Sequence, residues 1–125
     1  MKRLILKFGG TSVGTIEKIK KVANIIKKRL SEDNEIIVVV SAMSGVTDEL
    51  KAKSDLISKN FDDKELDVLL ASGEQASCSL LSGALIDLGV KARSWLGWQI
   101  PIVTNDNHTS SQIMKIKTDQ ILNFI

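Results

Sequence analysis

Two loops rich in glycine, serine and threonine hold the residues whose types could support chemistry. The first, residues 7–14, reads Lys-Phe-Gly-Gly-Thr-Ser-Val-Gly, and the second, residues 41–47, reads Ser-Ala-Met-Ser-Gly-Val-Thr. A helix is predicted after each loop, and the free N–H groups at the start of a helix attract anions. Because the first loop also begins with Lys7, the two loops together predict a phosphate-binding site.

The common phosphate-binding motifs do not fit these loops. Gly9 and Gly14 have the outer spacing of a P-loop, but Thr15 stands where that motif requires lysine. The dinucleotide-binding pattern Gly-x-Gly-x-x-Gly does not occur in the sequence. Here the lysine precedes the glycines, at the end of a predicted strand, and this order is the more specific feature.

The hydrophobic pattern places both loops at one edge of a parallel sheet. Residues 4–8 and 36–40 are typical of buried strands, the second as a strand covered on both faces, and apolar residues recur at helical spacing between 15 and 30. Such a strand–helix–strand unit is right-handed, so both loops leave the sheet at the same edge. Ligands bind at this edge in open α/β folds. We therefore predict an α/β fold with a mainly parallel sheet.

The remaining elements continue this alternation. They are a helix from about Thr47, a helix from the turn at 60–64 through Leu70, a helix from Ser72 to Leu88, strands at 90–96 and 102–103, and a helical pattern from Asp119. Ser72 and Gln75 have the spacing of a capping box at the start of the third of these helices. Gly89 suits a Schellman ending for the same helix.

The composition is that of an ordinary globular chain. Its 125 residues are 43% apolar and 26% charged, with a mass of 13.7 kDa, which indicates one domain or part of one. The longest uninterrupted apolar run, residues 36–40, is too short to cross a membrane. The single cysteine, Cys78, excludes an internal disulfide. We therefore expect a soluble, cytoplasmic protein without a membrane partner.

The charge is uneven along the chain. Residues 1–30 carry nine Lys/Arg and one acid, whereas residues 31–75 carry four bases and eleven acids. A basic segment can indicate nucleic-acid binding. Most of these bases, however, fall on the predicted amphipathic helix, as its solvated face, and no aromatic residue lies among its lysines to stack on bases. We expect no nucleic-acid partner.

Four segments together resemble the aspartate kinases of the amino-acid kinase superfamily. Residues 7–13, Lys-Phe-Gly-Gly-Thr-Ser-Val, resemble the opening motif of that family. Residues 40–50 resemble its second glycine-containing loop, and residues 70–75 resemble its Gly-Glu helix start. Residues 97–99, Gly-Trp-Gln, resemble a later segment. The resemblance implies a three-layer α/β/α sandwich with a mainly parallel sheet, the amino-acid kinase fold, here truncated.

The resemblance also implies a phosphotransferase. Such enzymes transfer the γ-phosphoryl group of ATP, bound with Mg²⁺, to L-aspartate and release 4-phospho-L-aspartate and ADP. The product leads to lysine, through diaminopimelate, and to threonine and methionine. Because the attacking carboxylate is already ionised at pH 7, no general base is needed, and catalysis can depend on positioning and on neutralising phosphoryl charge.

Seven residues receive roles from the same resemblance. ATP and its phosphates are assigned to Lys7, Phe8, Gly9, Gly10 and Ser41, and aspartate is assigned to Thr47 and Glu74. Lys7 is the expected catalytic group, and Glu74 is expected to bind the amino group of aspartate. No residue is expected to hold a metal, since His108 has no cysteine or second histidine near it in the sequence.

Simpler roles stay open for several of these residues. Lys7 could be an exposed lysine at a strand end, and the adjacent glycines Gly9 and Gly10 could serve only as a turn. Thr47 could cap its helix, and Glu74 could complement the helix dipole. Cys78, among small residues of a helix, is expected to serve packing.

The resemblance weakens towards the C-terminus. Ile100-Pro101 follow Gly-Trp-Gln where the family has small residues, and residues 109–112 lack the glycine and arginine of its His-Gly-x-Ala-Arg-Ile stretch. We expect residues 1–125 to be the N-terminal portion of an amino-acid kinase domain, without the nucleotide-binding C-terminal half and the ACT regulatory domains, and inactive alone. The alternative is a non-catalytic remnant or interaction module that retains the fold. Uncovered sheet edges and apolar faces also predict self-association.

Overall fold

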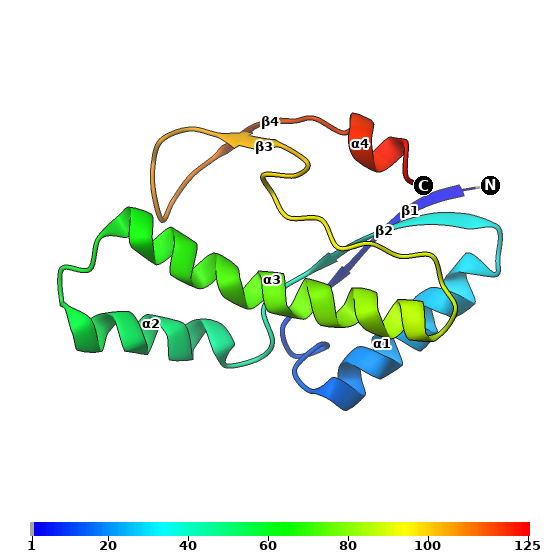
Figure 1. Cartoon of the computed structure of the whole chain (residues 1–125), viewed down its shortest axis with the longest axis horizontal. Helices are drawn as coiled ribbons and strands as arrows, with labels where there is room; N and C mark the ends of the chain where they lie inside the picture. The colour runs from blue at the N-terminus through cyan, green and yellow to red at the C-terminus, as the bar shows by residue number, and fades with distance from the viewer. Residues whose placement is uncertain (1) are drawn as a thin grey trace.

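A parallel strand–helix–strand unit opens the fold, as predicted. The computed structural model describes residues 2–125, and in it β1 (Lys2–Phe8) and β2 (Asn34–Val40) pair in parallel along their whole lengths. The connection between them is α1 (Ile16–Leu30) (Figure 1). Both strands begin about two residues earlier than the apolar pattern indicated, because backbone pairing continues into polar residues at their N-terminal ends.

The sequence of α1 explains its bounds and its orientation. Thr15 caps the helix, and its Oγ1 accepts a hydrogen bond from the N–H of Lys18 at 3.2 Å. Basic residues in the last turn complement the helix dipole. One face of α1 is buried in the core, and the lysines lie exposed on the other, as predicted for a solvated basic face.

The second helix, α2 (Val46–Ile57), begins one residue before Thr47. Its N-cap is Gly45, whose φ of 83° lies in the left-handed region that glycine adopts without strain. Thr47 therefore lies inside the first turn, and the alternative in which Thr47 caps this helix is wrong.

A single long helix, α3 (Asp63–Asp87), replaces the two helices predicted on either side of Ser72. Its N-cap is Asp62, whose carboxylate accepts a hydrogen bond from the N–H of Lys64 at 2.9 Å. The Ser72 hydroxyl donates to the carbonyl of Leu69 at 2.6 Å, inside the helix. Serine in mid-helix can satisfy its hydroxyl in this way, so the capping-box spacing was misleading. No helix within residues 2–125, α3 included, has both the length and the apolar character needed to cross a bilayer.

The end of α3 confirms the predicted Schellman motif. Gly89 has a φ of 80°. Its N–H donates to the carbonyl of Ile86 at 2.9 Å, and the N–H of Val90 donates to the carbonyl of Leu85 at 3.0 Å. These are the two backbone hydrogen bonds that define the motif.

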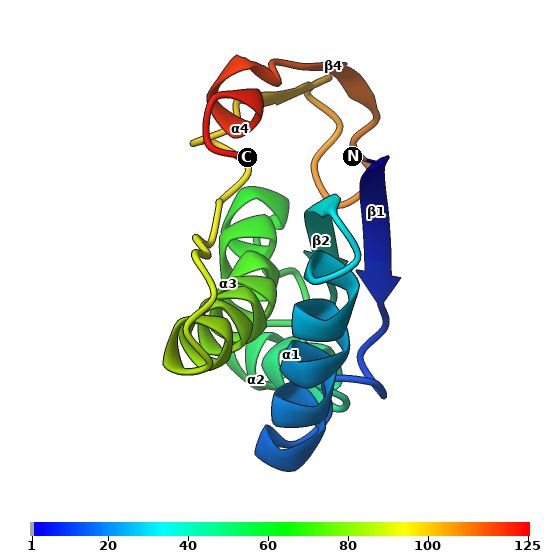
Figure 2. The same ribbon diagram turned by 90° about the vertical axis from the view of Figure 1, so that its right-hand side faces the viewer.

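The core lies between one face of the β1–β2 sheet and the helices α1 and α3, which pack side by side (Figure 2). Its buried apolar residues are Val13, Ile19, Val22, Ala23, Ile26, Leu81 and Leu85. The opposite face of the sheet is more open, since Ile5 is 70% exposed and Val39 is 48% exposed. The expectation that residues 36–40 are covered on both faces is therefore wrong for the described residues.

The C-terminal third forms a separate antiparallel pair. β3 (Ile102–Thr104) pairs with β4 (Ile113–Ile116), and α4 (Asp119–Leu122) follows (Figure 1). The predicted strand at 102–103 is thus confirmed as a strand, but it joins this pair and not the parallel sheet.

The predicted strand at 90–96 is wrong. This segment pairs with no strand, and it lines, together with β2, a hollow of about 760 Å³. Its side chains contact the C-terminus instead: Lys91 lies 4.5 Å from the ring centroid of Phe124, and the ring of Trp95 lies 6.0 Å from the same ring. Alternation in a sequence indicates a strand only where a partner strand is within reach.

Two glycines of α3 should respond oppositely to replacement by alanine. Gly83→Ala should raise the free energy of unfolding by about 0.5–1 kcal/mol, because Gly83 is exposed in mid-helix and its added Cβ meets nothing within 4 Å. Gly73→Ala should lower it by about 1 kcal/mol, since the new methyl would lie 3.1 Å from the side chains of Ala42 and Val46. Urea unfolding of both variants measures the difference, and shifts of the same sign would contradict this packing.

Candidate phosphate-binding site

The two loops predicted to meet at one edge of the sheet do so. The N–H of Ser41, just after β2, donates to the carbonyl of Phe8, the last residue of β1, at 3.2 Å. Further out, the N–H of Ser44 donates to the carbonyl of Gly10 at 3.1 Å. This confirms the predicted juxtaposition, which follows from parallel pairing of β1 and β2.

The adjacent glycines Gly9 and Gly10 have different surroundings. A Cβ placed on Gly10 would lie 2.8 Å from the carbonyl oxygen of Ala42, so the close approach of the two loops requires glycine there. A Cβ placed on Gly9 would meet no atom within 4 Å. Gly9 therefore faces open space, and an anionic group could approach its backbone.

The middle of α3 lies against the second loop and is the third element of this site, after the two loops. The Glu74 carboxylate accepts a hydrogen bond from the N–H of Ala42 at 3.4 Å, and the buried Ser77 hydroxyl donates to the carbonyl of Ser41 at 2.6 Å. Because Glu74 lies near the middle of α3, it cannot complement the dipole at a helix N-terminus, and that alternative is wrong. Its carboxylate is exposed next to the second loop.

Lys7 and Thr47 lie beside this junction. Lys7 is exposed as the last residue but one of β1, on the sheet face opposite the core, where alternation along the strand also places Ile5. Thr47 is exposed in the first turn of α2. Hydrogen bonds thus join Ser41 to Phe8, Ser44 to Gly10 and Ala42 to Glu74, and Lys7 and Thr47 lie near these residues along the chain.

Sequence reasoning missed Ser77. It lies one helical turn after Glu74 and faces the same loop. The spacing of three residues was a usable signal, because positions i and i+3 share one face of a helix. Nothing in the sequence, however, indicated that this face of the helix contacts the loop after β2.

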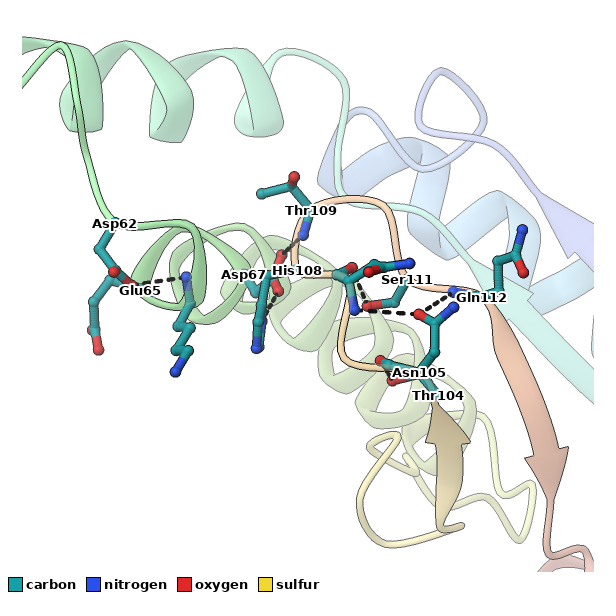
Figure 3. A network of polar contacts seen from close by, with 11 residues as sticks. Asp62, Glu65, Asp67, Thr104, Asn105, His108, Thr109, Ser111 and Gln112 are labelled. Carbon is teal, nitrogen blue, oxygen red and sulfur yellow. Dashed lines mark hydrogen bonds and ion pairs between the residues drawn. The ribbon is translucent and has the colours of Figure 1, made fainter.

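The loop of residues 105–112 is fixed to the start of α3 (Figure 3). His108 Nδ1 lies 2.6 Å from one Asp67 carboxylate oxygen, and the N–H of Thr109 donates to the other at 2.9 Å. Thr109 has a φ of 62°, which is costly for a β-branched residue, and it stands where the family pattern has glycine. Within residues 2–125, no three His, Cys, Asp or Glu side chains gather so as to hold a metal ion.

Cys78 lies one helical turn after Glu74, and both residues line the hollow beside β2. Burial raises the pKa of its thiol, although a hydrogen bond with Ser94 acts in the other direction. A thiol with a raised pKa is a poor nucleophile at pH 7, which is consistent with the packing role predicted for it.

Comparison with known proteins covers the whole described chain. The model of the amino acid kinase family matches residues 2–125. The aspartokinase of Rickettsia felis is 44% identical over 128 residues, which include 100% of this chain and 32% of that protein. The aspartokinase of Geobacillus stearothermophilus is 45% identical over 118 residues, 94% of this chain and 29% of that protein. The chain thus spans about a third of the length of these relatives.

Two solved structures have a fold similar to that of this chain. The crystal structure of aspartate kinase from Synechocystis superposes with a TM-score of 0.67 at 46% identity, covering 70% of this chain and 15% of that one. E. coli aspartokinase III, in complex with aspartate and ADP, superposes with a TM-score of 0.69 at 23% identity, covering 87% of this chain and 34% of that one. This similarity confirms the predicted fold class, including its parallel sheet.

Proposed function

Because the chain belongs to the amino acid kinase family, we propose that residues 1–125 are the N-terminal part of an aspartate kinase. Such an enzyme transfers the γ-phosphoryl group of ATP to L-aspartate and produces 4-phospho-L-aspartate for lysine, threonine and methionine synthesis. The chain spans only 32% of the Rickettsia felis relative, so we further propose that another polypeptide segment completes the nucleotide site. A cytoplasmic location would suit this chemistry and the single cysteine.

The phosphate end of ATP is assigned to the two loops. The open space at Gly9 lets phosphate oxygens approach the backbone, and the exposed Lys7 ammonium would neutralise charge on the transferring group. Phe8, Gly10 and Ser41 hold the loops in place through backbone contacts. Mg²⁺ would arrive on the phosphate oxygens of ATP, and we assign no residue of this chain to it.

The acceptor end is assigned to Thr47 and Glu74. The exposed Glu74 carboxylate can pair with the ammonium group of aspartate, because its hydrogen bond from Ala42 is long, at 3.4 Å. The β-carboxylate of the substrate then attacks the γ-phosphorus and ADP leaves. Since this nucleophile is already ionised, the residues only need to hold it in line and neutralise charge.

One observation supports the proposal most strongly. The peptide N–H of Ala42 donates a hydrogen bond to Glu74 of α3. The N–H of the preceding residue, Ser41, donates to the carbonyl of Phe8 in the first loop. The residues proposed for the phosphate and for the acceptor are therefore parts of one connected site.

A chimera tests the proposal. Residues 1–125 would replace the corresponding segment of the Geobacillus stearothermophilus aspartokinase, and ADP release would be measured with Mg-ATP, with and without L-aspartate. We expect aspartate-dependent turnover within about 10-fold of the parent enzyme, because the aligned segments are 45% identical. A folded chimera that releases no ADP in response to aspartate would favour the non-catalytic alternative.

We also propose that the isolated chain self-associates. Within residues 2–125 the parallel sheet has two strands and so two free edges, and Ile5 on its open face is 70% exposed. Sedimentation equilibrium should give an average mass that rises with concentration. A constant mass near 13.7 kDa at high concentration would contradict this prediction.

A further inference from the structure

We propose that Ser77 is a positioning residue that holds the loop after β2 in the conformation needed for phosphoryl transfer. This inference rests on the proposed function for its catalytic consequence, but the contacts themselves are independent of it. Ser77 is 0% exposed and lies on α3, outside the set of residues expected to touch either substrate.

The geometry centres on the peptide unit between Ser41 and Ala42. Its carbonyl accepts a hydrogen bond from the Ser77 hydroxyl at 2.6 Å, and its N–H donates to the Glu74 carboxylate at 3.4 Å. The Ser77 oxygen also lies 3.1 Å from the Glu74 carbonyl, but a hydroxyl has one hydrogen, and the shorter contact takes it. Two residues one helical turn apart therefore hold both polar groups of one peptide unit.

These two contacts have different strengths and should behave differently during the reaction. Glu74 is exposed, and its contact is long, so the ammonium group of aspartate can compete for its carboxylate. The contact from Ser77 is short and buried, where no substrate reaches it. When aspartate is bound, Ser77 alone would keep the peptide unit in place.

The rest of the loop depends on that peptide unit. The N–H of Ser41 bonds to Phe8, and the N–H of Ser44 bonds to Gly10. A rotation of the Ser41–Ala42 peptide would disturb both bonds and so change the distance between the phosphate-facing loops. Loss of the Ser77 hydroxyl should therefore slow the chemical step more than it weakens substrate binding.

The chain contains a matched control in Ser54. It is also 0% exposed, and its hydroxyl donates to the carbonyl of Lys51 at 2.7 Å. That carbonyl belongs to the same helix, so Ser54 connects no separate elements. Replacing Ser54 with alanine removes an equally buried hydroxyl without affecting the loop.

The first experiment measures amide hydrogen exchange by NMR in the full 125-residue chain. Ser77→Ala should accelerate exchange at the N–H groups of Ser41, Ala42 and Ser44 by about 10-fold relative to Ser54→Ala, as expected for the loss of one hydrogen bond. Equal exchange at these amides in the two variants would overturn the proposal. Because no substrate is present, this result does not depend on the proposed kinase activity.

The second experiment measures steady-state kinetics of the same variants in the chimera. Ser77→Ala should lower kcat by about 10-fold and leave the KM for ATP within about 2-fold, whereas Ser54→Ala should leave both unchanged. Equal kinetic losses in the two variants, or a higher KM with unchanged kcat for Ser77→Ala, would overturn the positioning role. A chimera that is inactive before mutation would instead count against the proposed function.

Discussion

Replacing Lys7 with alanine should lower the kcat of phosphoryl transfer by about 10²- to 10³-fold, the usual cost of losing one group that stabilises transition-state charge. The prediction applies to the chimera that carries residues 1–125. Lys7 stands at the end of β1, where the two loops meet, and its ammonium is exposed. The KM for aspartate should change little, because Glu74 and Thr47 are the residues proposed to bind aspartate.

The stability of the variant separates catalysis from folding. Lys7 lies on the open face of the sheet, so Lys7→Ala should change the free energy of unfolding by no more than about 0.5 kcal/mol. Lys2→Ala is a suitable control, since Lys2 is an exposed lysine of the same strand at its far end. If Lys2→Ala slowed turnover as much as Lys7→Ala, or if neither did, the proposed role of Lys7 would be wrong.

The parts of the fold that were predicted correctly depend on local signals. The apolar runs at 4–8 and 36–40, with helical spacing between them, were sufficient for the parallel unit, because two buried strands joined by a helix pair in parallel, almost always with a right-handed connection. The juxtaposition of the two loops followed from that unit alone. The Schellman ending at Gly89 was likewise local, as it depends on one residue that tolerates a positive φ.

The parts of the fold that were missed have two different causes. Ser72 has a local capping pattern, yet the helix continues through it because its hydroxyl is satisfied inside the helix. The segment at 90–96 has a strand-like pattern, but it lines a hollow together with β2 and pairs with no strand. Only the segment at 90–96 was decided by tertiary structure, whereas Ser72 has a local hydrogen bond that is an alternative to capping.

Some residues of the candidate site could likewise be placed from the sequence, and others could not. Gly10 and Ser41 could be placed from sequence because they directly follow the paired strands. The position of Glu74 beside Ala42 could not, since it depends on the course of α3 across the second loop. Ser77 was missed altogether for that reason, although its hydrogen bond to the second loop, at 2.6 Å, is shorter than that of Glu74.

Replacing the adjacent glycines Gly9 and Gly10 with alanine should affect different properties, namely activity alone at Gly9 and both stability and activity at Gly10. In Gly10→Ala the new methyl would lie 2.8 Å from the carbonyl oxygen of Ala42, so the loops must separate. We expect a loss of about 1–3 kcal/mol in the free energy of unfolding, as for overpacking, together with a loss of activity. In Gly9→Ala the methyl meets no atom of the chain within 4 Å, and stability should change by less than about 1 kcal/mol.

Gly9→Ala should nevertheless impair the reaction strongly. Its methyl would occupy the space through which we propose that the phosphates approach the backbone, so kcat/KM for ATP should fall by about 10²-fold in the chimera. Urea unfolding and ATP-dependent kinetics of both variants provide the comparison. Full activity in Gly9→Ala would mean that the phosphates bind elsewhere. A methyl group and a carbonyl oxygen cannot stay 2.8 Å apart, so the two loops must separate in Gly10→Ala. Unchanged stability in this variant would therefore mean that the contact between the first loop and Ala42 does not stabilise the fold.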